Sequence, residues 1–383
     1  MQQGLSKLDK GNFKEAIEDF TKVIYAADEN QADALLNRGL CYVQLGQLEN
    51  AIADFSRAID IAPDYPAAYF NRGLARLQKG ELKAAHRDFT ITIDLAPEDA
   101  EAYFQRGITR YQLGELSAAL SDFNTAIQRD VKFIPAYYHR GIVYLALFRY
   151  AAAVDDFSHV LKEDAANGMA YALRGKAKGR LGKYEEALQD LNIALILVPD
   201  LAEAFVYRGA VIAALGNFQE AAENFKAARE LGFNASELRL EEIRLLWLQQ
   251  KVDTALSALD SLLLSEPNYI DALFLRASMH SMKKNWQLAE VDLNRCIQLN
   301  SHHWQAYELL SQVALAQNKI SEAIENLNKA IKLNTSDPEL YYKRAQIYRH
   351  NGDTKKACLD LRKSKELGKN IPPEELLPIC GSH

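Results

Sequence analysis

The sequence is poor in the residues that build covalent or metal-bound frameworks. Only four cysteines occur in 383 residues, at positions 41, 296, 358 and 380, and no two of them form a Cys-x-x-Cys pair. This spacing favours neither a disulfide framework nor a zinc site, and it fits a protein of a reducing compartment. We expect the cysteines to be packing residues, with Cys41 and Cys296 at helix-core positions.

Long apolar runs and an excess of positive charge are also absent. No run of 18 apolar residues is present, so no membrane insertion is expected. The first residues lack a charged-then-apolar signal pattern, so secretion is not expected, and the Asn-x-Ser/Thr matches at Asn234 and Asn334 are interpreted as chance. The net charge of −6 disfavours a nucleic-acid binder. These absences predict a cytoplasmic protein.

The sequence lacks the motifs of the common catalytic sites. It contains no phosphate-binding loop, no dinucleotide-binding glycine motif, no His-Glu-x-x-His and no Gly-x-Ser-x-Gly. His302 and His303 fall in an expected inter-repeat loop and are predicted to be solvated, and Cys380-x-x-His383 is too short for a metal site. We therefore expect no catalytic residue, no cofactor, no bound metal and no small-molecule substrate.

The chain instead repeats itself every 34 residues. An Ala-x-x-x-Phe/Leu phrase recurs ten times without a slip in register, with its alanine at positions 51, 85, 119, 153, 187, 221, 255, 289, 323 and 357. Each unit has apolar residues at helical spacing, a turn that often holds glycine, and a second helix that often stops before proline, as at Pro63 and Pro97. No segment alternates with period two, so only helices are expected.

These residues resemble the tetratricopeptide repeat family, whose 34-residue pattern is matched by Tyr103, Gly107, Ala119, Phe123 and Ala126. The resemblance implies an all-α, right-handed superhelical solenoid of antiparallel helix pairs with a concave, peptide-binding groove. It covers about ten full repeats: a partial N-terminal repeat at 1–31, regular repeats at 32–235, divergent repeats at 236–368, and a tail or cap at 369–383. A weaker resemblance links the chain to long ciliary members of the family.

A regularly spaced glycine and arginine mark the first helix of the regular repeats. The mid-helix glycines, such as Gly73 and Gly107, indicate a close approach of the second helix, where we expect its alanine to fit and its phenylalanine to lie beside it. The arginine recurs with an aspartate sixteen residues later, which predicts a salt-bridged ladder within each repeat. The alternative is that both residues lie on solvated faces. The ladder comprises Arg38 and Asp54, Arg72 and Asp88, Arg106 and Asp122, Arg140 and Asp156, and Arg174 and Asp190.

The family resemblance assigns the groove to the fifth, sixth, ninth, twelfth and thirteenth positions of each repeat. In the first four repeats these positions carry aromatic residues beside a stripe of amides, which suits a clamp on an extended peptide backbone. The alternative is that they pack against neighbouring repeats. The candidate groove residues are Asn37, Phe70, Asn71, Phe104, Gln105, Tyr138, His139, Gln44, Gln78 and Gln112.

Two features bear on the partners. Leu40, Leu74 and Ile108 replace the asparagine of the family's two-carboxylate clamp, which disfavours binding of Hsp70 or Hsp90 C-termini. Residues 343–369 hold nine Lys/Arg and three acids, a surplus that fits either an acidic partner or a solvated capping helix.

The main prediction is a non-catalytic adaptor whose groove binds extended or helical segments of partner proteins within a multiprotein assembly. The alternative is a regulatory or targeting arm of a larger enzyme, transport, ciliary or cytoskeletal machine, which would place the chain at a cilium or on the cytoskeleton. RNA binding is disfavoured by the acidic balance and by the 34-residue period.

Overall fold

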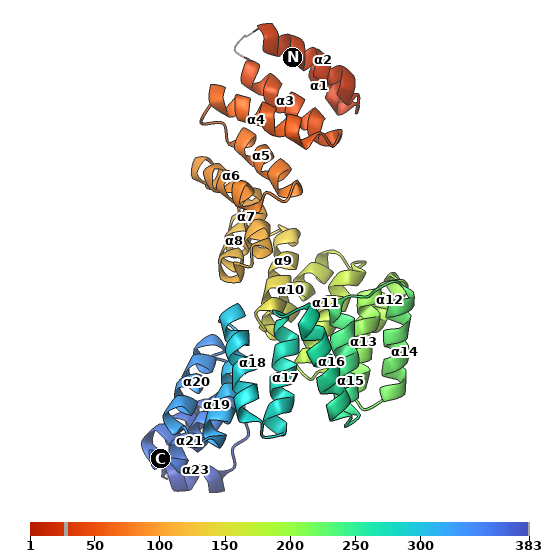
Figure 1. Cartoon of the computed structure of the whole chain (residues 1–383). Helices are drawn as coiled ribbons and strands as arrows, with labels where there is room; N and C mark the ends of the chain where they lie inside the picture. The colour runs from red at the N-terminus through yellow and green to blue at the C-terminus, as the bar shows by residue number, and fades with distance from the viewer. Residues whose placement is uncertain (27–29, 382–383) are drawn as a thin grey trace. The chain divides into compact units, whose positions relative to one another are not determined.

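The computed structural model describes residues 1–26 and 30–381, which form helices and contain no strand (Figure 1). Helices that follow one another in the sequence pack against each other in pairs. The described helices are α1 (Gln2–Asp9), α2 (Phe13–Ala26), α3 (Gln31–Gln44), α4 (Leu48–Ile61), α5 (Pro66–Gln78), α6 (Leu82–Leu95), α7 (Ala100–Gln112), α8 (Leu116–Arg129), α9 (Ile134–Ala146), α10 (Tyr150–Glu163), α11 (Gly168–Arg180), α12 (Tyr184–Leu197), α13 (Ala202–Ala214), α14 (Phe218–Glu230), α15 (Ser236–Leu248), α16 (Val252–Ser265), α17 (Ile270–Met282), α18 (Trp286–Leu299), α19 (Trp304–Ala316), α20 (Ile320–Leu333), α21 (Pro338–His350), α22 (Thr354–Glu366) and α23 (Pro373–Cys380). The predicted all-α solenoid of helix pairs is confirmed.

Local sequence sets where the helices begin and end. Asp99 caps α7 by accepting hydrogen bonds from the backbone N–H groups of Glu101 and Ala102, at 3.0 and 3.3 Å. Pro66 occupies the first turn of α5, where its missing N–H costs nothing. The turn inside a repeat needs a residue with positive φ, and Gly114 supplies it at 79°.

The same turn position is not always glycine. Phe148, Gln250, Lys284 and Asn318 stand in the 34-residue register of the turn glycines and also have positive φ, between 58° and 64°. Packing of the two helices therefore forces the left-handed conformation even on side chains that disfavour it.

The mid-helix glycine makes room for the phenylalanine of the second helix. A Cβ atom added to Gly73 would lie 2.8 Å from Cε1 of Phe89, and the neighbouring repeats repeat this relation. The close approach predicted from the glycines is therefore present. The aromatic ring is the nearest neighbour of Gly73, and Ala85 is also fully buried.

At seven of these joints the arginine donates two hydrogen bonds to the aspartate sixteen residues later, and at an eighth Arg208 donates one of 2.7 Å to Asn224. Arg106 Nε and Nη2 lie 3.0 and 2.8 Å from the two carboxylate oxygens of Asp122, which is buried. The other nitrogen reaches back to the preceding repeat, where Arg72 binds Ser56 at 3.1 Å and Arg140 binds Asn124 at 2.8 Å. The arginine thus joins three helices, which the sequence pattern alone did not indicate. The same paired geometry holds for Arg38–Asp54, Arg72–Asp88, Arg140–Asp156, Arg174–Asp190, Arg276–Asp292 and Arg344–Asp360.

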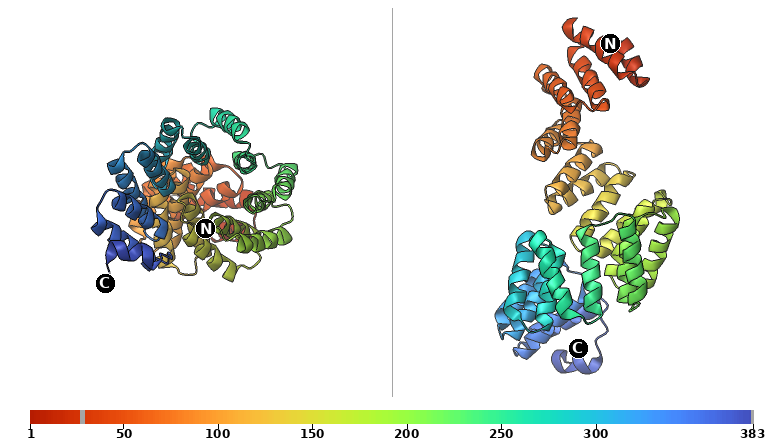
Figure 2. Two further views of the ribbon diagram at one scale, coloured as in Figure 1. Left: turned by 90° about the horizontal axis from the view of Figure 1, so that it is seen from below. Right: turned by 45° about the vertical axis from the view of Figure 1, so that its right-hand side comes forward.

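The chain divides into two compact units. The first unit comprises Met1–Ala146 and Ala152–Ala165, and the second comprises Leu147–Ala151 and Ala166–His383. Within the second unit, the helices from α11 to α22 follow one another along a curved path, which the left view of Figure 2 shows end-on. The sequence-based limits at 31/32, 235/236 and 368/369 stay predictions.

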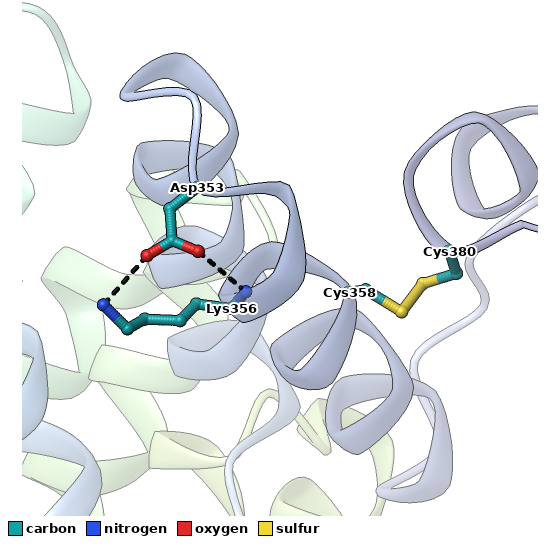
Figure 3. The surroundings of a disulfide bond; sticks show 4 residues. All are labelled: Asp353, Lys356, Cys358 and Cys380. Atoms are coloured by element: carbon teal, nitrogen blue, oxygen red, sulfur yellow. Dashed lines mark hydrogen bonds and ion pairs between the residues drawn. A yellow bond between two sulfur atoms is a disulfide. The ribbon is translucent and has the colours of Figure 1, made fainter.

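A disulfide joins Cys358 on α22 to Cys380 on α23 (Figure 3). The expectation that all four cysteines are packing residues was therefore wrong for this pair. The two positions are 22 residues apart in sequence, and only the folding of α23 back onto the last helix pair brings their Cα atoms within 5.0 Å. Cys41 and Cys296 are free and fully buried, as predicted.

None of the helices in the described part of the chain is long and apolar enough to cross a membrane.

Candidate functional site

The groove residues predicted in the first unit are largely engaged within their own repeats. The ring of Phe104 is buried and lies 5.8 Å from that of Phe123 and 5.3 Å from that of His139. Phe70 and Tyr138 are half-buried and contact the rings of Phe89 and Phe157 in the same way. The aromatic stripe therefore contributes to helix packing as well as to the surface.

The amides of the same stripe bond to their own helices. Asn37 and Asn71 each donate a 2.7 Å hydrogen bond to the carbonyl four residues earlier, and Gln105 donates one of 2.7 Å to Glu101. Gln44, Gln78 and Gln112 are exposed. Whether these side chains hold a peptide stays a prediction.

In the second unit, ion pairs within the chain occupy some of the positions that the family resemblance assigns to the groove. Lys176 on α11 lies 2.6 Å from Glu237 on α15, and Arg180 lies 2.9 Å from Glu241, so α11 is tied to α15 across α13. Burial by itself would raise the pKa of Glu241, but Arg244 and Arg180 outweigh it and lower the pKa. Glu241, Lys176 and Arg180 occupy the sixth, ninth and thirteenth positions of the family register, and Glu237 occupies the second. These side chains at predicted groove positions therefore bind one another.

An open cavity of about 490 Å³ lies further along the second unit, between α19 and α21. Its apolar wall comes from Leu315, Leu327 and Ile347, and its polar wall includes Gln312 and Gln346. The cavity adjoins Leu327, which stands where the regular repeats have phenylalanine.

The rim of this cavity is charged and hydrogen-bonded. Lys343 on α21 forms an ion pair with Glu308 on α19, which Gln312 also contacts through a 3.4 Å hydrogen bond. The hydroxyl of Tyr342 donates to Glu375 of α23 at 2.8 Å, and Gln346 donates to the same carboxylate at 2.7 Å. Glu375 of the last described helix therefore holds two of the polar side chains that line the cavity.

This cavity was missed by the sequence reasoning, although the register could have found it. Glu308, Gln312 and Leu315 are the fifth, ninth and twelfth residues of one repeat, and Tyr342 and Gln346 are the fifth and ninth of the next. Groove residues are predicted only in the first four repeats. The substitution of Ser311 for the mid-helix glycine was the visible signal that packing changes here.

His303 corrects a further expectation. The residue was predicted to be solvated, but it is 1% exposed and its ring lies 4.0 Å from Phe148 and 4.8 Å from Phe274. Its Nδ1 accepts a hydrogen bond from the N–H of Ala306 and so caps α19. Phe148, distant in sequence, supplies the ring that covers it, and no local pattern reports such a contact.

The described residues hold no cluster of His, Cys, Asp or Glu that could bind a metal ion. The basic segment 343–369 is extensively paired, since Lys343, Lys356, Lys363 and Lys369 bind Glu308, Asp353, Glu366 and Glu339. These contacts favour the interpretation of a solvated last repeat over an unshielded basic patch.

Comparisons with known proteins give the same repeat over most of the chain. A model described as TPR repeat matches residues 39–80 and 312–352. Two models described as tetratricopeptide repeat match residues 70–132 and 172–235, and residues 1–30, 134–167 and 338–369. The matched segments together span most of the chain.

The relatives carry the same kind of repeat. Tetratricopeptide repeat protein 13 of Homo sapiens is 31% identical over 125 residues, which are 31% of this chain and 14% of that protein. The C-terminal part of a TPR repeat-containing protein from Cytophaga hutchinsonii has a TM-score of 0.51 at 18% identity, over 62% of this chain and 97% of that one. A tetratricopeptide repeat protein from Parabacteroides merdae has a TM-score of 0.48 at 23% identity, over 65% and 96%. Identities this low show the fold alone.

Proposed function

Since the chain belongs to the tetratricopeptide repeat family, we propose that it is a non-catalytic scaffold that binds a segment of a partner protein in the cavity between α19 and α21. The family membership indicates a protein-interaction scaffold. The observation that carries the finer proposal is the cavity itself, because most of its lining residues stand at the groove positions of two consecutive repeats.

The lining defines the kind of segment that fits. Leu315, Leu327 and Ile347 offer an apolar surface to one anchoring side chain, which contributes most of the affinity. Gln312 and Gln346 can donate to and accept from a peptide backbone without reading its side chains. The Glu308–Lys343 ion pair lies beside them, so a partner that carries charges of both signs is favoured. An extended peptide with one large apolar residue satisfies these requirements.

The test uses a phage-displayed random peptide library selected against the described chain. Peptides that emerge should bind wild type at least about tenfold more tightly than Leu315→Asp, since losing one apolar anchor costs roughly 1.5–3 kcal/mol. Leu315 is 40% exposed, so the substitution leaves the fold intact. Leu288→Asp on α18, at a 52% exposed position that does not line the cavity, is the matched control. Equal binding to all three proteins, or no enriched peptide, would contradict the proposal.

A second binding surface on the first unit remains part of the proposal. The half-buried Phe70 and Tyr138 and the exposed Gln44, Gln78 and Gln112 lie on the predicted groove register. A triple Asn71→Ala, Phe104→Ala, Tyr138→Ala variant that captures the same partners as wild type would reject this surface.

The wider setting stays a prediction from the sequence. It includes the multiprotein assembly, the alternative of a regulatory arm in a larger machine, and the cytoplasmic, ciliary or cytoskeletal location. The expected absence of a catalytic role and of chaperone C-termini as ligands also stays a prediction from the sequence.

A further inference from the structure

Two cysteines near the C-terminal end are paired, and two elsewhere are shielded. Cys358 and Cys380 are partly exposed and form the disulfide shown in Figure 3. Cys41 and Cys296 are fully buried, and burial raises the pKa of their thiols to about 11 and about 12. Low exposure and a raised pKa both protect a thiol from oxidation. One disulfide and two shielded thiols are compatible with an oxidising environment, and the disulfide is the feature that points to one.

Disulfides persist in secreted proteins and in the lumen of the secretory pathway, and they are rare in the cytosol. Formation of the bond removes two protons and two electrons from the two thiols, and a protein disulfide of that compartment accepts them. A chain that folds there also meets the enzyme that glycosylates Asn-x-Ser/Thr sites. The two Asn-x-Ser/Thr matches in this sequence, at Asn234 and Asn334, are therefore candidate glycosylation sites.

Asn234 has the position that a glycan requires. It lies in the loop between α14 and α15, after Gly232 with φ of 83°, and its side chain is exposed. Ser236, the hydroxyl residue of the motif, begins α15 and contacts Glu266. Neither residue lines the cavity between α19 and α21, so a glycan here leaves that cavity open.

Asn334 is a poorer candidate in the folded chain. It follows α20 as its C-terminal cap, is half-buried, and its Nδ2 lies 3.5 Å from Asp337, the residue that caps α21. Its Oδ1 accepts a 3.3 Å hydrogen bond from Ser336. A sugar on this amide would have to displace the capping arrangement between two helices.

We infer that the chain passes through an oxidising, glycosylating compartment and carries an N-linked oligosaccharide on Asn234. Asn234 Nδ2 forms the new bond to the anomeric carbon of an oligosaccharide held on a lipid pyrophosphate. The bond from that carbon to the pyrophosphate oxygen breaks, and the amide nitrogen loses one proton. The inference is independent of the proposed peptide site, and it would replace the cytoplasmic location expected from the sequence.

The test isolates the natural protein that contains this chain from cells of its own species. We expect peptide N-glycosidase to shift it to lower mass and, in ¹⁸O water, to convert Asn234 into labelled aspartate. Alkylation without reduction should leave Cys358 and Cys380 unlabelled. Asn234→Gln and Ser236→Ala should abolish the labelled site, while Ser236→Thr should retain it.

Three results would overturn the inference. They are an unmodified Asn234 peptide in wild type, alkylated Cys358 and Cys380 in the untreated protein, or a labelled site at Asn334 alone. Because Ser236→Thr keeps the motif and the hydroxyl, loss of the glycan through misfolding is distinguished from loss of the acceptor.

Discussion

Arg276 holds Asp292 through two hydrogen bonds of 2.8 and 2.7 Å, and its remaining nitrogen binds Asp260 of the preceding repeat at 2.7 Å. The Asp292 side chain is 5% exposed, whereas that of Asp260 is 62% exposed. The Arg276 guanidinium thus forms one buried and one exposed ion pair. Substituting each aspartate in turn measures how much each pair contributes to the free energy of unfolding.

Removal of the buried partner should cost far more than removal of the exposed one. Asp292→Ala leaves the part-buried arginine without its main acceptor and should lower the free energy of unfolding by roughly 3–5 kcal/mol. Asp260→Ala should cost less than about 1 kcal/mol, because solvent screens that pair. Urea denaturation, followed by circular dichroism, measures both. Equal losses in the two variants would show that the buried pair has no special role.

The second unit should become less stable in mild acid because of His303. Burial lowers the pKa of His303 to about 4, while the unfolded chain takes up its proton near pH 6.5. Between these values only the unfolded state is protonated, so stability is full above pH 6.5 and falls as the pH drops toward 4. The loss approaches roughly 3 kcal/mol.

Denaturation midpoints between pH 4 and 8 test this effect. His303→Asn retains a helix-capping acceptor and removes the titrating group, so its midpoint should vary less with pH than that of wild type. His302→Asn, at the adjacent and more exposed position, should follow wild type. A wild-type profile that matches His303→Asn would refute the linkage.

The turn positions with positive φ should respond to glycine. Lys284 has φ of 60° on an exposed turn, so Lys284→Gly should raise the free energy of unfolding by about 0.5–1 kcal/mol. The reverse change Gly114→Ala, at φ of 79°, should lower it by about the same amount. Thermal melting of both variants checks the signs. If Lys284→Gly instead lowers the free energy of unfolding, the lysine side chain stabilises the fold by more than its strained backbone conformation costs.

The C-terminal helix should loosen when its disulfide is reduced. Ile371 is buried against Ala345 and Leu361, with Leu376 packed beside them, but this cluster is small. A bond that closes a 22-residue interval contributes about 3 kcal/mol at most. Hydrogen exchange of α23 should therefore be faster in a Cys358→Ser, Cys380→Ser variant. Exchange in α11–α14 serves as the internal control and should not change.

The repeat pattern determined most of the fold because the residues that form each helix pair and its turn lie within one 34-residue unit of the sequence. Alanine and phenylalanine at fixed spacing give the helix pair, glycine gives the turn, and an unbroken register gives the array. The intra-repeat pairing of Arg106 with Asp122 followed from the same logic, since the arginine and the aspartate are present or absent together in every repeat except that of Arg208 and Asn224. Nearest-neighbour packing is a local property, and a local property can be obtained from a periodic sequence.

Contacts between distant repeats were decided only by the tertiary structure. The stacking of Phe148 on His303, the ion network from Lys176 to Glu237, and the return of Cys380 to Cys358 depend on how the helices curve and where the last one folds back. Each of these joins residues outside one repeat unit, and a 34-residue pattern carries no information about such distances.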